Sequence, residues 1–219
     1  KDDYEYFMYL EHDIRFSEEN FQYLVKYQDY LSEKKFNLGF LVYERNHNDN
    51  KKYCIHLTRK LKNFINIGSK KFFINDFENY CCFWIYNKEI FKSFIKTEWW
   101  LFKKKPYNFR HYYGTTERSS IGYHALNIDF FKTTLLPETN NKPDQNCFVE
   151  HMTNNYFEKF SNIEKNNHFD IRGVCKFDIE NLYEDSHYQK KVKDYFYLNK
   201  YIKILFWKLR FLKRIIKND

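Results

Sequence analysis

The chain has 219 residues, enough for one sizeable domain with its own hydrophobic core. Only 5 glycines and 3 prolines occur, which excludes collagen-like and linker-rich chains, and 43% of hydrophobic residues argues against a disordered one. The formal net charge of +8 favours an anionic partner such as nucleotide phosphates, nucleic acid or an acidic membrane surface.

The cysteines and the termini carry little sign of export. The five cysteines form neither a CxxC pair nor a metal-ligand spacing, so we expect reduced thiols that pack as small hydrophobic side chains. No signal peptide and no apolar run long enough to cross a bilayer is visible, which favours a cytoplasmic protein. The chain begins with Lys1 rather than Met, and we expect a processed or incomplete sequence.

The first half of the chain alternates between strand and helix patterns. Residues 4–10 form an unbroken aromatic run typical of a buried strand. Ser17 then caps a helix that reaches about Lys34, with Phe21, Leu24, Val25 and Leu31 on its apolar face. Residues 38–44 read as a strand. Residues 53–68 fit both strand alternation and helical spacing, so their structure stays open.

The second half continues the alternation. Strands are predicted at 71–76 and 80–86, and Asn87 caps a helix that ends near Trp99 and Trp100. A basic, aromatic loop at 101–113, a short helix from Thr115 or Thr116 and a strand near 133–137 follow. Alternating strands and helices predict the α/β class.

The C-terminal segment has a different character. Residues 200–217 contain seven basic residues and no acid, with the basic and apolar side chains on opposite faces at helical spacing. Such a basic amphipathic helix suits an anionic membrane surface, but it also fits a helix that packs on the domain. The predicted organisation is an α/β domain at 1–190 and this helix at 191–219.

Four places combine acids or histidine with the end of a strand or the start of a helix: Glu11 with Asp13, Glu44 with Arg45, Glu117, and His151. In open α/β sheets, ligands bind beyond the carboxyl ends of the strands, so these residues are candidates for one shared cleft. Each also has an ordinary structural explanation: a solvated strand end, a favourable helix-dipole partner, or a core histidine.

The order of five short motifs resembles nucleotide-sugar glycosyltransferases of the GT-A type, in particular bacterial-type members. The chain reads "YLEHDIRFSEENF", "GFLVYE", "FWIYN", "ERSSIG" and "HMTNNY" in that order, spanning residues 4–156. Glu11 and Asp13 take the acidic positions of an E-x-D motif. His12 stands where an acid is common, and Glu117 lies one position away from the acid of the family pattern.

The resemblance implies a GT-A-like mixed sheet flanked by helices. Such folds place a nucleotide-binding βαβ half before the acidic motif, whereas only about ten residues precede it here. The implied domain therefore lacks that half, or the chain is a piece of a longer protein. The implied activity moves a sugar from a nucleotide-sugar donor to a glycan or lipid-linked acceptor.

The resemblance also implies a divalent cation, Mn²⁺ or Mg²⁺, that neutralises the charge on the leaving diphosphate. Asp13 would bind this cation, with Glu11 assisting and His151 completing the coordination. Glu117 would act as the general base towards the acceptor hydroxyl, with Glu44 as the reserve candidate.

Arginines and tryptophans complete the implied site. Arg45, Arg110 and Arg118 would contact phosphate oxygens of the donor. Trp99 and Trp100 would stack on sugar rings of the acceptor, although packing in the core is the alternative role for both.

Two other functions remain open from the sequence. Residues 103–110, "KKKPYNFR", mix basic and aromatic side chains as single-stranded nucleic-acid sites do, but no RNA-binding signature or glycine-rich phosphate loop accompanies them. The other is a catalytically inactive glycosyltransferase-like scaffold, suggested by His12 and by the missing half.

The C-terminal segment generates the first prediction. If residues 200–217 lie on a membrane, each basic residue contributes about 1 kcal/mol of attraction to acidic lipids, and salt screens that attraction. We expect the intact chain to sediment with anionic vesicles, less so at high salt, and a chain ending at Leu198 to stay folded in the supernatant. Unfolding on truncation, with no vesicle binding by the intact chain, would instead assign the helix to the core.

Overall fold

The structure is a computed structural model, and it describes residues 3–47, 49–55, 57, 60–75, 80–97, 100–101, 119–124, 131, 133–153 and 177–189. This part of the chain is mixed α/β, built mostly of strands in three sheets, with two α-helices. The predicted α/β class is confirmed at this level. The predicted loop at 101–113, apart from residue 101, and the predicted C-terminal helix at 191–219 lie outside the described residues.

Three sheets divide the strands between them. One sheet pairs β1 (Tyr6–Leu10) antiparallel with β8 (Phe83–Asn87). A second has the spatial order β10 (Lys142–Pro143), β9 (Thr134–Thr139), β7 (Lys70–Asn75), β6 (Leu61–Ile67) and β13 (Tyr183–Gln189), with β3 (Asn37–Leu38) also beside β9. The third has the order β12 (Phe177–Asp178), β5 (Lys52–Cys54), β4 (Leu41–Arg45), β11 (Phe148–His151) and β2 (Ile14–Arg15).

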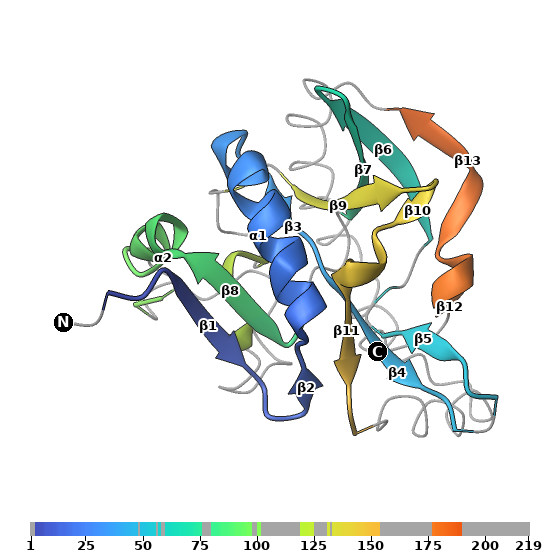
Figure 1. Cartoon of the computed structure of the whole chain (residues 1–219), viewed down its shortest axis with the longest axis horizontal. Coiled ribbons are helices and arrows are strands. Elements are labelled where there is room, and N and C mark those ends of the chain that lie inside the picture. The colour runs from blue at the N-terminus through green and yellow to red at the C-terminus, as the bar shows by residue number, and fades with distance from the viewer. Residues whose placement is uncertain are drawn as a thin grey trace, which may run out of the picture.

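Helix α1 lies between the β1–β8 sheet and the strands of the other two sheets (Figure 1). The helical elements are α1 (Glu18–Glu33), α2 (Lys88–Phe94), and the 3₁₀ turns η1 (Gly122–His124), η2 (Gln145–Cys147) and η4 (Ile179–Asn181). No helix in the described part of the chain is long and apolar enough to span a membrane.

Both predicted helix caps are confirmed. The Ser17 hydroxyl accepts the backbone N–H of Asn20, and the Asn20 side chain accepts the N–H of Ser17, which satisfies two of the donors left over at a helix start. Asn87 caps α2 by accepting the N–H of Ile90 at 2.9 Å. Helix α2 ends at Phe94, earlier than predicted.

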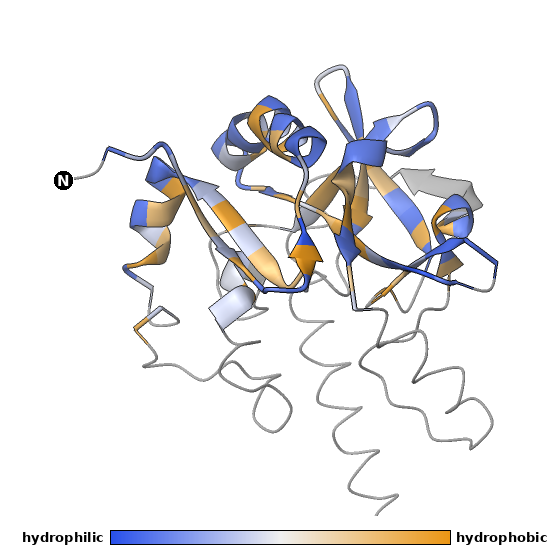
Figure 2. Cartoon of the chain, turned by 60° about the horizontal axis from the view of Figure 1, so that its bottom comes forward, coloured by the Kyte–Doolittle hydropathy of each residue, from blue (hydrophilic) through white to orange (hydrophobic). Residues whose placement is uncertain are grey.

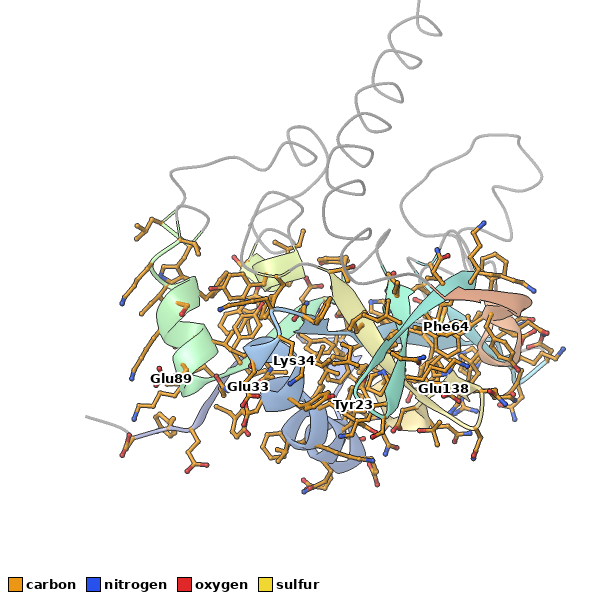
Figure 3. The ribbon with its side chains drawn as sticks, turned by 90° about the horizontal axis from the view of Figure 1, so that it is seen from above. Tyr23, Glu33, Lys34, Phe64, Glu89 and Glu138 are labelled. Carbon is orange, nitrogen blue, oxygen red and sulfur yellow. The ribbon has the colours of Figure 1, made fainter. Side chains whose placement is uncertain are left out.

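The buried face of α1 differs in part from the prediction. Tyr23, Leu24, Tyr27 and Leu31 are buried, and Figure 3 shows Tyr23 among the side chains packed between α1 and the strands. Val25, which was predicted on this face, is 43% exposed. Tyr23 and Tyr27 lie one helical turn apart and fill the interface between α1 and the strands. The buried face of α1 therefore does not include Val25.

The open question at residues 53–68 is settled in favour of strands. Residues 52–54 form β5 and residues 61–67 form β6. Strand β6 pairs with β7 on one side and with β13 on the other, and Leu61, Ile65 and Ile67 point from one of its faces into the main core. The helical spacing in this segment does not correspond to a helix.

Strand β8 separates two groups of core side chains. Phe83 and Ile85 belong to the main core, while Trp84 and Tyr86 belong to a second, aromatic core with Phe94. Because both faces of β8 are buried, Phe83 to Tyr86 are all aromatic or aliphatic, and the strand alternates between orange and pale bands in Figure 2. The strand starts at Phe83, three residues later than predicted, since Cys82 has a φ of 61° in the left-handed region.

The cysteines of the described chain behave as predicted. Cys54, Cys81, Cys82 and Cys147 are buried free thiols. Burial raises the pKa of Cys81 to about 12, so this thiol stays protonated and unreactive. Cys175 lies outside the described residues.

Gly122 is required where the aromatic core meets η1. Its φ of 51° is one that L side chains rarely adopt, and an added Cβ would lie 2.8 Å from the Trp84 Cβ and closer still to the Tyr86 hydroxyl. That hydroxyl also accepts the N–H of Tyr123 at 2.6 Å. A side chain at position 122 would therefore push apart a hydrogen-bonded contact.

We expect Gly122→Ala to lower the free energy of unfolding by about 3 kcal/mol or more, through backbone strain and overpacking together. Gly68→Ala is the matched control, because Gly68 has a similar φ of 60° but only the Tyr30 hydroxyl nearby, at 3.2 Å. Its expected cost is about 1 kcal/mol, from the backbone alone. Urea denaturation of both variants tests this, and equal losses would contradict the steric explanation.

Candidate functional site

Three distant segments meet at one edge of the third sheet. Strands β4 and β11 are parallel, and the register sets Glu150 opposite Tyr43, so His151 and Glu44 follow on the other face of the sheet. Strand β2 pairs antiparallel with β11, with Ile14 opposite His151. The Met152 N–H donates to the Asp13 carbonyl at 2.8 Å, which ties the β1–β2 turn to the end of β11.

His151 lies between two carboxylates. Its Nδ1 is 2.7 Å from Glu44 Oε1, and its Nε2 is 3.1 Å from Asp13 Oδ2. The His151 and Glu44 side chains are 5% and 0% exposed, so the contacts are shielded from water. The Nδ1 contact with Glu44 is a hydrogen bond, and the Nε2 contact with Asp13 is at ion-pair distance, so a protonated His151 suits both partners.

The charges around His151 favour this protonated form. Burial by itself lowers the pKa of His151, but the hydrogen bond to Glu44 and the negative charges of Asp13, Glu44 and Glu11 outweigh it. The net result is a pKa above the ordinary histidine value. Three carboxylates around one imidazolium leave an excess of negative charge.

One oxygen of Asp13 has no partner. Asp13 Oδ2 binds His151, whereas Asp13 Oδ1 is buried without a hydrogen bond from the described residues. A buried carboxylate oxygen without a partner is costly, and such an atom in a native site indicates a missing cation or donor. Asp13 is thus the residue of this cluster best placed to bind a cation.

Glu11 belongs to an adjoining hydrogen-bonded chain. Tyr80 donates its hydroxyl to Glu11 Oε1 at 2.7 Å, and the same hydroxyl oxygen lies 3.0 Å from Ser120 Oγ. The Glu11 N–H also donates to the Cys82 carbonyl at 3.2 Å. Sequence reasoning missed Tyr80, the first residue of a predicted strand, and Ser120, which lies inside the motif ERSSIG, because nothing local marks them as partners of Glu11.

Other predicted site residues lie apart from this cluster. Arg45 shares the opposite face of β4 with Tyr43, and its Nη1 donates to Asn50 Oδ1 at 3.2 Å. Trp100 packs edge-on against Phe94 with ring centres 5.4 Å apart, while remaining 41% exposed. Glu117, Arg110, Arg118 and Trp99 lie outside the described residues.

The described residues do not form a closed metal cage. In the described part of the chain, no three His, Cys, Asp or Glu side chains are arranged to hold a metal ion. Both nitrogens of His151 face carboxylates, so the prediction that His151 completes the coordination gains no support here. Asp13 and Glu11 supply carboxylate oxygens, the ligand type that a hard cation such as Mg²⁺ takes from one or two carboxylates together with substrate phosphates.

Comparison with known proteins adds no further evidence, since no protein-family model, curated protein or solved structure matches the chain. The case for a function therefore depends on the motifs and on the geometry just described.

The raised pKa of His151 predicts how stability depends on pH. The imidazolium contributes stability that is fully present below the unfolded pKa of about 6.5 and is lost as pH rises through the higher folded value. We expect His151→Gln to destabilise the fold by about 3 kcal/mol at pH 6, because it leaves Glu44 buried without its positively charged histidine partner. The difference in the free energy of unfolding between wild type and variant, called the gap below, should narrow as pH rises.

Urea denaturation from pH 5 to 9 measures that gap. His12→Gln is the matched control, since His12 is an exposed histidine in the same turn. A gap between wild type and His151→Gln that is the same at every pH would contradict a charged His151.

Proposed function

We propose that this chain is a metal-dependent glycosyltransferase that moves a sugar from a nucleotide-sugar donor to a glycan or lipid-linked acceptor. The observation that carries the proposal is the contact of Asp13, Glu44 and His151 in one buried cluster. The three residues come from three of the motifs that resemble GT-A enzymes, and they are far apart in the sequence. Independent structural roles would give no reason for them to meet.

The reaction needs a counter-charge for the diphosphate that leaves when the glycosidic bond breaks. A bound Mn²⁺ or Mg²⁺ supplies this charge as a Lewis acid. Asp13 would hold the cation through its unpartnered Oδ1, with Glu11 as the second carboxylate. The excess negative charge of the cluster favours a divalent cation over a neutral ligand.

His151 and Glu44 keep Asp13 in place. The imidazolium binds Asp13 Oδ2, which leaves Oδ1 as the free oxygen of the same carboxylate. Glu44 holds the ring from the other side and has no exposed surface. A carboxylate without access to an acceptor hydroxyl is a poor general base, so the geometry supports Glu44 as a positioning residue.

The remaining roles rest on the resemblance alone. Glu117 stays the proposed general base, and Arg110 and Arg118 stay the proposed phosphate contacts. Because Arg45 lies on the face of β4 opposite the cluster, it gives less support to a donor contact. The segment 200–217 would bring the enzyme to lipid-linked acceptors.

Calorimetry with UDP, with and without Mn²⁺, tests the metal site. We expect Mn²⁺ to tighten UDP binding. Removing an outer-shell partner of a metal typically weakens metal affinity about 10–100-fold, and we expect Asp13→Asn to weaken the Mn²⁺-dependent UDP binding by at least that factor. Glu150→Gln is the control, because Glu150 is next to His151 on β11 but points to the opposite face, where it pairs with Arg15.

Two outcomes would count against the proposal. If neither Mn²⁺ nor Asp13→Asn changes the UDP affinity, the proposed metal site is wrong. Metal-dependent UDP binding without sugar transfer, across UDP, GDP and CMP sugars, would favour the inactive scaffold.

A further inference from the structure

Beside the His151 cluster, a second chain of hydrogen bonds ends on Glu11. It runs from Ser120 to Tyr80 and from Tyr80 to Glu11, with distances of 3.0 and 2.7 Å. Ser120 has no exposed surface, and the neighbouring Ser119 carbonyl accepts the Trp84 Nε1–H at 2.8 Å. The segment that carries Ser120 is thus held against the aromatic core.

The direction of these hydrogen bonds follows from the charges. Burial, together with the nearby Cys82 and Glu11, holds the pKa of Tyr80 well above its ordinary value, so the phenol keeps its proton. The Tyr80 hydroxyl therefore donates its hydrogen bond to Glu11 Oε1. Since Tyr80 has no second proton, the Ser120 hydroxyl must donate to the Tyr80 oxygen.

We propose that Tyr80, supported by Ser120, positions the Glu11 carboxylate for the divalent cation of the proposed glycosyltransferase. The inference rests on that proposed function. Tyr80 binds one oxygen of Glu11, Oε1, and leaves the other oxygen to face the cation. Tyr80 is a positioning residue, because it acts through Glu11 and touches no reacting atom.

Such support matters because the glutamate side chain is long. Without a fixed partner, the Glu11 side chain would sample several rotamers. Fixing one rotamer on metal binding would cost conformational entropy, which would lower the affinity for the metal. Hydrogen bonds to the ligating carboxylate orient it beforehand, and their loss typically weakens metal binding about 10–100-fold. On the Asp13 side, His151 does the corresponding task.

Titration of the whole chain with Mn²⁺ by calorimetry tests the inference without an activity assay. We expect Tyr80→Phe to weaken Mn²⁺ binding about 10–100-fold and to have no further effect in a Glu11→Gln background. Ser120→Ala, which keeps Tyr80, should weaken it less. Tyr30→Phe is the matched control, since it removes a hydroxyl that donates to the Ile67 carbonyl at 2.7 Å, away from the site.

The outcomes separate the inference from the function on which it rests. Wild-type affinity in folded Tyr80→Phe, or an equal further loss when Tyr80→Phe is added to Glu11→Gln, overturns the inference while the metal site stands. If Tyr80→Phe fails to fold, unchanged affinity in Ser120→Ala overturns it instead. A wild-type chain that binds no Mn²⁺ overturns both proposals.

Discussion

The candidate site depends on the buried contacts of His151 with Glu44 and Asp13. A carboxylate with no exposed surface, such as Glu44, is several kcal/mol too costly to bury in its charged form unless a cation and hydrogen bonds compensate. His151 provides both to Glu44 and reaches Asp13 with its second nitrogen. One ring therefore fixes the end of β4, the end of β11 and the β1–β2 turn relative to one another.

The two faces of the third sheet carry different ion pairs. On one face of β4 and β11 lie Glu44 and His151. On the other, Arg15 pairs with Glu150, and Lys52 lies over the Tyr43 ring at 4.8 Å. Because neighbouring residues of a strand point to opposite faces, Arg15 and Lys52 contact Glu150 and Tyr43 on the face away from the cluster. The carboxylates of the cluster therefore support the proposed divalent cation.

The aromatic strand β8 supports the Glu11 side of the site. Its two faces join two cores, and the left-handed backbone at Cys82 lies just before the start of the strand, where the Cys82 carbonyl accepts the Glu11 N–H. Tyr80 lies just before this break, so it can turn towards Glu11 instead of continuing the strand. Core packing and the proposed metal site are linked here, because Tyr80 packs against the core and donates a hydrogen bond to Glu11.

The sequence by itself determined the features that depend on near neighbours. Ser17 and Asn87 were recognisable as caps, because a cap needs only its own side chain and an N–H three residues later. The acids that follow β1 were likewise visible as candidates. Tertiary structure decided the rest, since strand pairing and side-chain contacts join residues that are distant in the chain. Only the pairing of β6 with β7 and β13 made residues 61–67 a strand, and only the register of β4 and β11 set Glu44 towards His151 and Arg45 away from it. A shift of one residue in that register would exchange the two faces, and no local pattern specifies it.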